Sequence, residues 1–181
     1  SKFGASFKSK NNKLPLIMKG LKTPNSIKYI EDKGSAQCKT SIIFAALKSK
    51  GETIIKAKKS RNHTELLLKY LKVPIKIKKN KNYDLIKIKK IKKLSQLNYR
   101  IPGDISSCAF FIVLTILSKS SKLLIKNINV NPTRIGLITI LNRMGASIKL
   151  LNKRSYKGEK IADIFVKSSK NLRSINCPVE L

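Results

Sequence analysis

Apolar positions in the first half of the chain recur with two different periods, which predict alternating strands and helices. At 36–47 and 63–71 they return every three or four residues, as on one face of a helix. Between residues 74 and 89, Ile and Lys alternate, which is typical of strands with one buried and one solvated face. We therefore expect strands at 26–30, 52–57, 74–78 and 85–89 and helices at 36–47 and 63–71.

The second half repeats this order. Its first helix, 105–117, is almost entirely apolar, and we expect it to be buried. Asn131 and Pro132 are predicted to cap and open the next helix, which should stop at Gly145. The elements are expected at 98–101, 105–117, 122–127, 133–144, 147–151 and 161–166, and a strand at 13–19 is interpreted as the remainder of an earlier unit.

The two halves are related by a shift of about 70 residues, and such internal repeats define the architectural unit. The shift places Cys38 on Cys108 and residues 54–56 on 124–126. We predict an α/β (α+β) fold of repeated βαβαββ units, with a boundary at Pro102-Gly103. Each unit opens its first helix with a Ser-containing turn. Because a helix N-terminus presents free N–H groups and partial positive charge, we expect anion capture there, with a substrate phosphate as the candidate.

Charge is the outlier of the composition: 40 Lys and Arg against 9 Asp and Glu give a net charge of +31. Such a field attracts nucleic acid, anionic membranes or small anionic substrates. However, 34 of the 40 basic residues are Lys, and the Arg that favours base edges and bidentate phosphate contacts is scarce. We therefore favour compositional drift and predict a solvated sheet face at 76–93.

The three cysteines, Cys38, Cys108 and Cys177, form no metal-binding spacing, and there is a single His. We expect no metal and no cofactor, with Cys38 and Cys108 as reduced core thiols in a cytoplasmic protein. No signal peptide is visible, and the longest apolar stretch falls short of the ~18 residues that a membrane span needs.

Taken from the residues alone, the candidates for chemistry lie before helices. Ser35 and Gln37 open one helix, and Ser60 and Arg61 precede the next. Arg61 is suited to a bidentate phosphate contact, although each of these residues also has an ordinary structural role. Asp104 is most simply the N-cap of the second half's apolar helix.

These residues also carry a resemblance. The strings SAQCK (35–39), SRNHTE (60–65), PGDISSCAFF (102–111), NPTR (131–134) and RMGA (143–146) closely resemble the 5-enolpyruvylshikimate-3-phosphate synthases, which belong to the enolpyruvyl transferases. The resemblance implies two domains, each of three βαβαββ units, with the active site in the cleft between them. It also implies a fragment, with the C-terminal part of the first domain at 1–100, including one full unit at about 26–90, and the first unit of the second domain at 101–181.

The resemblance implies transfer of the enolpyruvyl group from phosphoenolpyruvate to the 5-hydroxyl of shikimate 3-phosphate, without a cofactor, on the route to chorismate and aromatic amino acids. It places substrate contacts on Ser35, Ala36, Gln37 and Arg61, with Ser60 a weaker candidate. PGDISS and NPTR are interpreted as hinge and helix-start structure. No catalytic residue is expected within the chain, because the family's acid, base and clamp groups would lie before residue 1 or after residue 181.

Other interpretations stay open. The related transferase acting on UDP-N-acetylglucosamine shares the fold, but PGDISS and SRNHTE speak against it. A Lys-rich nucleic-acid-binding module would explain the charge, but no recognition motif supports one. A decayed, noncatalytic copy is a further alternative, because Lys33-Gly34 before Ser35 is unusual for the family. We expect a monomer when the protein is complete, with no specific nucleic acid and no membrane as partner.

Overall fold

The computed structural model describes residues 2–177 and divides into two compact units, at 1–96 and 97–181. The predicted domains, 1–100 and 101–181, placed the boundary a few residues later. Their outermost residues, 1 and 178–181, lie outside the described part. The assignment of the units to the last and first repeats of two domains stays a prediction.

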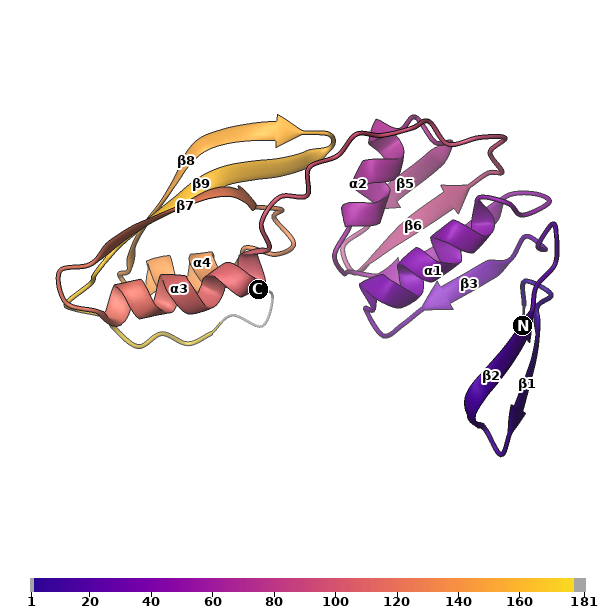
Figure 1. The fold of residues 1–181 in the computed structure, drawn as a ribbon, viewed down its shortest axis with the longest axis horizontal. Helices are drawn as coiled ribbons and strands as arrows, with labels where there is room; N and C mark the ends of the chain where they lie inside the picture. Colours follow the sequence, from indigo (N-terminus) through magenta and orange to yellow (C-terminus); the bar gives the residue numbers. More distant parts are fainter. Residues whose placement is uncertain (1, 178–181) are drawn as a thin grey trace. The chain divides into compact units, whose positions relative to one another are not determined.

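Unit 1 contains a four-stranded sheet in the order β3-β4-β6-β5, with two helices on one face (Figure 1). β3 pairs parallel with β4, and the other neighbours are antiparallel. The elements are β3 (Lys28–Glu31), α1 (Ala36–Ala46), β4 (Thr53–Lys58), α2 (His63–Tyr70), β5 (Ile75–Lys79) and β6 (Tyr83–Ile88). The predicted βαβαββ order of this half is therefore confirmed.

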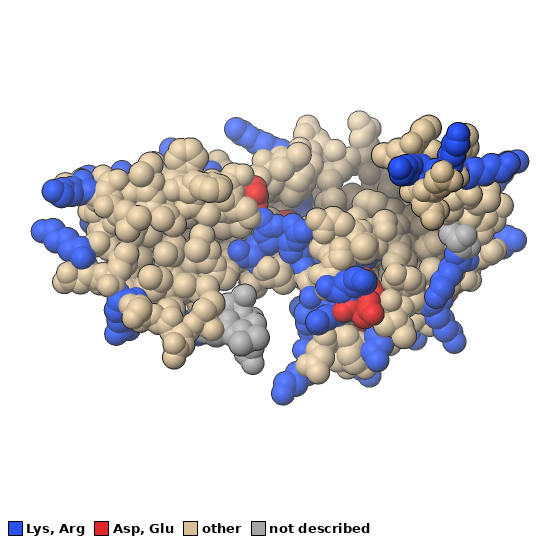
Figure 2. Space-filling view, turned by 90° about the horizontal axis from the view of Figure 1, so that it is seen from below, with Lys and Arg blue, Asp and Glu red and all other residues tan. Residues whose placement is uncertain are grey.

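The core of unit 1 lies between this sheet and its helices. Ile42 and Ile43 of α1 and Leu68 of α2 pack against Ile55 and Ile86 of the strands. In β5 the Lys side chains at 76 and 78 are exposed, which confirms that one face of the sheet is open to solvent here. On the face drawn in Figure 2, Lys and Arg are spread over many places, as expected for dispersed charge.

A separate hairpin precedes this sheet. β1 (Ser6–Lys10) pairs antiparallel with β2 (Lys13–Lys19), which has the predicted bounds. All twelve residues of the two strands are exposed. Whether β2 derives from an earlier repeat stays a prediction.

Unit 2 has the same plan, with α3 and α4 on one face of a three-stranded antiparallel sheet in the order β7-β9-β8 (Figure 1). A single parallel bridge, Gly103 to Ile128, stands where unit 1 has β3 beside β4. The elements are α3 (Ile105–Leu117), β7 (Lys122–Asn129), α4 (Gly136–Arg143), β8 (Ser147–Tyr156) and β9 (Glu159–Lys167).

Three predicted elements of unit 2 are clearly wrong in extent. The strand expected at 147–151 continues to Tyr156, because β8 resumes its pairing with β9 at Arg154 after an irregular position. The strand expected at 98–101 does not form, because the segment pairs with β7 only at Gly103, next to a Pro that lacks an N–H. The helix expected from residue 133 begins at Gly136. The side chain of Asn131 accepts from the backbone N–H of Thr133 at 2.9 Å, and the Arg134 N–H bonds the Asn131 carbonyl at 2.8 Å, which closes a turn first.

The expectation that α3 is buried is wrong for one of its faces. Ile112 and Ile116 are buried against the sheet. Phe110, Phe111, Leu114 and Leu117 are 79%, 60%, 64% and 69% exposed. A sheet covers only one side of a helix that is apolar all round, so the other side stays open in this chain.

Cys38 is also not the core thiol that was expected. It is exposed, whereas Cys108 is buried. The buried stripe of α1 runs through Lys39, Ile42 and Ile43, and Cys38 lies one residue before it, turned away by about 100°. Burial raises the pKa of the Cys108 thiol, and the charge of Asp104 adds to this.

We expect the exposed face of α3 to bind apolar probes. A contiguous patch of large apolar side chains is a binding surface for such molecules. The chain should therefore enhance and blue-shift the fluorescence of the neutral dye Nile red, and F110S/L117S should remove most of this signal. A control pair, L14S/I17S, changes apolar residues that are 87% and 67% exposed on β2. An equal loss of signal in the control would contradict the assignment to α3.

Candidate functional site

A small pocket in unit 1 collects the start of α1 and the start of α2. Its volume is about 180 Å³. One wall comes from the first turn of α1 and the other from the segment that leads into α2. The residues that line it are Ala36, Gln37, Thr40, Arg61, His63 and Thr64.

The start of α1 is held by hydrogen bonds close to it in the sequence. Ser35 is the N-cap, and its Oγ accepts from the backbone N–H of Cys38 at 3.2 Å. The buried carboxylate of Glu31 accepts from the backbone N–H groups of Lys33, Gly34 and Ser35, each at 3.1 Å. This carboxylate therefore fixes the turn through which the chain enters the pocket wall.

Three contacts tie the two walls together. Lys39 Nζ lies 2.7 Å from Glu65 Oε1 and donates to the Arg61 carbonyl at 2.9 Å. The hydroxyls of Thr40 and Thr64 are 2.7 Å apart. These contacts therefore connect the start of α1 to the start of α2, although the two segments are more than 20 residues apart in the sequence. Arg61 contributes the pocket's guanidinium, and no carboxylate is among the lining residues.

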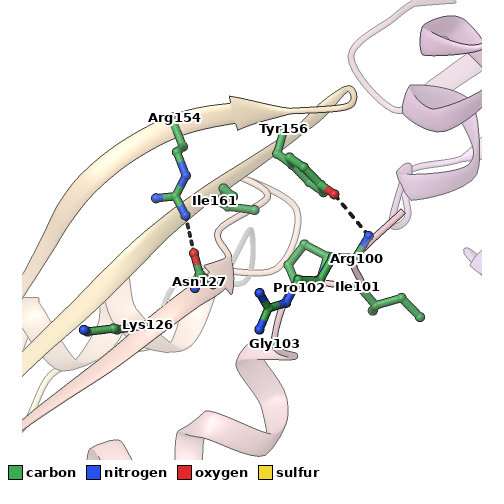
Figure 3. Close-up of a pocket in the computed structure, with 9 residues that line it drawn as sticks. All are labelled: Arg100, Ile101, Pro102, Gly103, Lys126, Asn127, Arg154, Tyr156 and Ile161. Carbon is green, nitrogen blue, oxygen red and sulfur yellow. Dashed lines mark hydrogen bonds between the residues drawn. The ribbon is translucent and has the colours of Figure 1, made fainter. Parts of the chain in front are cut away.

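Unit 2 contains a larger pocket of about 380 Å³. Figure 3 shows that its side chains come from the segment before α3 and from β7, β8 and β9. The Tyr156 hydroxyl accepts from the backbone N–H of Arg100 at 3.1 Å, and Arg154 donates to the side chain of Asn127. The rings of Tyr99 and Tyr156 lie 5.4 Å apart. Burial raises the pKa of the Tyr99 hydroxyl, and the negative charge of Glu159 raises it further. The lining residues are Arg100, Ile101, Pro102, Gly103, Lys126, Asn127, Arg154, Tyr156 and Ile161.

A carboxylate behind this pocket joins two irregular strand positions. Asn127 and Asn152 have φ of +57° and +49°, where β7 and β8 lose their regular pairing with β9. Asp163 of β9 accepts from the Asn127 backbone N–H and from the Asn152 side chain, both at 2.8 Å. The pKa of Asp163 is lowered, mainly by the hydrogen bond from the Asn152 side chain and then by the bond from the Asn127 backbone. The positive charges of Arg154 and Lys126 lower it further.

The Asp163 network should make unit 2 sensitive to acid. Because the folded pKa is lowered, the stabilisation is present above the unfolded value of about 3.9 and is lost as the pH falls through the folded value. D163N should therefore melt below the parent chain at pH 7, and the difference should shrink towards pH 3. D32N, a change at an exposed acid, controls for the loss of one negative charge. A difference in melting temperature that is constant from pH 7 to pH 3 would contradict this role.

The described residues form neither a metal-binding cluster nor a membrane-spanning helix. No group of three or more His, Cys, Asp or Glu within residues 2–177 is placed to hold a metal ion. In the same part of the chain, no helix has the length and apolar character to cross a membrane.

Comparison with known proteins places the chain in a family. The sequence model for EPSP synthase (3-phosphoshikimate 1-carboxyvinyltransferase) matches residues 1–180. The chain belongs to the EPSP synthase family. The 3-phosphoshikimate 1-carboxyvinyltransferase of Endomicrobium trichonymphae is 43% identical over 171 residues, which are 94% of this chain and 39% of that protein. That of Legionella pneumophila (strain Corby) is 38% identical over the whole chain and 41% of its own length.

A solved EPSP synthase has the same fold. The structure from Acinetobacter baumannii superposes with a TM-score of 0.82 at 34% identity, over 97% of this chain and 39% of that one. The family and the α/β fold of repeated units that the five strings predicted are thereby confirmed. The chain spans 39 to 41% of the length of these relatives.

The predicted site residues of this EPSP synthase family member divide into two groups. Ala36, Gln37 and Arg61 line the unit 1 pocket. Ser35 and Ser60 are not among the lining residues. Ser35 caps α1, and the buried Oγ of Ser60 has no hydrogen-bond partner. No ligand contact tests their roles, which stay predictions.

Sequence reasoning missed four residues around the pocket. Thr40 and Thr64 lie in its wall, and Lys39 and Glu65 lie behind it. A signal was present, because Lys39 and Glu65 occupy positions three residues before buried Ile42 and Leu68, where the helical period demands an apolar residue.

The strings PGDISS and NPTR meet each other in the structure. Asp104 caps α3 by accepting from the Ser106 N–H at 3.2 Å, as predicted. Arg134 Nη2 contacts Asp104 Oδ1 at 2.7 Å and the Ser106 hydroxyl at 2.6 Å. The guanidinium therefore joins the turn before α4 to the start of α3.

Proposed function

We propose that this chain is part of an EPSP synthase and holds the phosphate of shikimate 3-phosphate in the unit 1 pocket. The reaction transfers the enolpyruvyl group of phosphoenolpyruvate to the 5-hydroxyl of shikimate 3-phosphate, with release of inorganic phosphate. The observation that carries the proposal is the meeting of the SAQCK and SRNHTE segments at a single pocket with one guanidinium.

The chemistry of the lining suits a phosphate dianion. Arg61 offers two parallel N–H donors, which match phosphate oxygens. The N-terminal turn of α1 adds the positive end of a helix dipole. No carboxylate in the lining repels the anion. We assign the phosphate to Arg61 and Ser35, with Ala36 at the helix start. Ser60 remains the weaker candidate, because its hydroxyl is buried and does not line the pocket.

Gln37 is proposed to contact both substrates. It is an exposed residue of the first turn of α1, and its amide carries both donors and an acceptor. In this role it orients phosphoenolpyruvate relative to the 5-hydroxyl. The addition needs a proton delivered to the methylene carbon and one removed from the hydroxyl. We assign neither transfer to the residues of this pocket, which bind and orient.

Family membership supports shikimate 3-phosphate and phosphoenolpyruvate as the partners. We further propose that the complete protein is a cytoplasmic monomer that uses no cofactor and has neither a specific nucleic acid nor a membrane as a partner. The diffuse Lys charge supports nonspecific attraction of anions in preference to recognition of a base sequence.

Calorimetric titration tests this function on the 181-residue chain. We expect saturable binding of shikimate 3-phosphate, clearly tighter than that of shikimate, which lacks the phosphate. With phosphoenolpyruvate added, the release of inorganic phosphate should stay at background. Equal affinity for shikimate and its phosphate would contradict the assignment of the pocket, and tighter binding of UDP-N-acetylglucosamine would favour the related transferase.

A further inference from the structure

The ion pair of Lys39 and Glu65 is buried almost completely. The side chains are 1% and 3% exposed, and the charged atoms are 2.7 Å apart. The pair joins the first turn of α1 to the first turn of α2, directly behind the unit 1 pocket. Neither residue lines the pocket itself.

Stability alone does not account for such a pair. Removing two charges from water costs several kcal/mol, and an apolar pair of similar volume is often as stable. Here the cost is increased, because Glu65 Oε2 is buried without a hydrogen-bond partner. An apolar pair would lack one contact that Lys39 makes, the hydrogen bond from Nζ to the carbonyl oxygen of Arg61 at 2.9 Å.

That hydrogen bond acts on the backbone that carries the guanidinium. Arg61 lies before α2, so the hydrogen-bond ladder of that helix does not hold its carbonyl. Glu65 holds the Lys39 ammonium from one side, and the ammonium holds the Arg61 carbonyl from the other. The Thr40 to Thr64 hydrogen bond keeps the two helix starts at a constant separation beside it.

We propose that Lys39 and Glu65 are positioning residues, which orient the Arg61 backbone so that its guanidinium faces the phosphate of shikimate 3-phosphate. The inference rests on the proposed function in taking that phosphate as the ligand. The arrangement of Lys39, Glu65 and the Arg61 carbonyl is independent of the ligand.

The decisive variant is K39M/E65L, which replaces both charges with apolar side chains of similar size. Its melting temperature should equal or exceed that of the parent chain. Shikimate 3-phosphate should nevertheless bind about 10-fold more weakly, because the guanidinium is no longer held in place. The backbone amides of residues 61–63 should exchange with solvent faster, with no change elsewhere in unit 1. The pair K39L/E65M, with the longer side chain on α2, provides the same test if the first pair packs poorly.

The outcomes separate the inference from the proposed function. Parent-like affinity and parent-like exchange at residues 61–63 in a folded double variant would show that the ion pair only fills space, and would overturn the inference. Absence of shikimate 3-phosphate binding in the parent chain would overturn the proposed function. In that event, the exchange at residues 61–63 still decides whether Lys39 and Glu65 position this backbone.

Discussion

Replacing Lys39 alone by Met should lower the free energy of unfolding of unit 1 by about 3 to 5 kcal/mol, because it leaves the Glu65 carboxylate buried and unpaired. This is a large part of the stability of a small domain. Hydrogen exchange of the unit 1 amides is the suitable measurement, because a chain of two units need not unfold in one step.

Lys59 offers a matched control for this change. Its Nζ lies 2.8 Å from Asp84 Oδ1, but its side chain is 44% exposed. Lys59→Met removes the same charge from an ion pair of similar length, and we expect a loss of less than about 1 kcal/mol. Equal losses for the two variants would show that the burial of Lys39 does not set its contribution.

Arg61→Ala should weaken shikimate 3-phosphate binding roughly 10- to 100-fold, or about 1.5 to 3 kcal/mol, because it removes a charge-assisted contact. Ser35→Ala should lower the binding free energy of shikimate 3-phosphate by only about 1 kcal/mol, because it removes one neutral hydrogen bond and part of a helix cap. Gln37→Ala should have a different effect, because in the complete enzyme it should weaken the binding of phosphoenolpyruvate as well as that of shikimate 3-phosphate.

The affinity measurements need a control for the overall charge. Arg143→Ala removes one positive charge from an exposed position on α4 in unit 2 and should leave the affinity unchanged. Melting curves of each variant exclude simple unfolding. Unchanged affinity in a well-folded Arg61→Ala chain would show that the phosphate is bound elsewhere.

Sequence alone predicted much of the pocket and missed the contacts behind it. Gln37 and Arg61 stand in recognisable strings, and the structure brings both to one pocket. The buried pair of Lys39 and Glu65 was overlooked, because a charged residue in a helix is ordinarily exposed. Lys39 and Glu65 are 26 residues apart, and the sequence around neither residue indicates that the two side chains meet.

What the sequence by itself determined about this protein is local or periodic. Ser35 and Asp104 cap their helices, and Gly145 follows α4 with a φ of +94°, because each interaction depends on neighbours within a few residues. The period of two in the strands and the period of 3.6 in the helices depend only on backbone geometry, so the βαβαββ order of unit 1 was predictable.

Only the tertiary structure decided which faces are covered and which distant groups meet. One face of α3 stays exposed although its sequence is apolar all round, because the sheet of unit 2 covers one side. Asp163 holds the two irregular positions Asn127 and Asn152 from a third strand. Burial and ion pairing depend on packing between segments far apart in the chain, which neither periodicity nor local propensity describes.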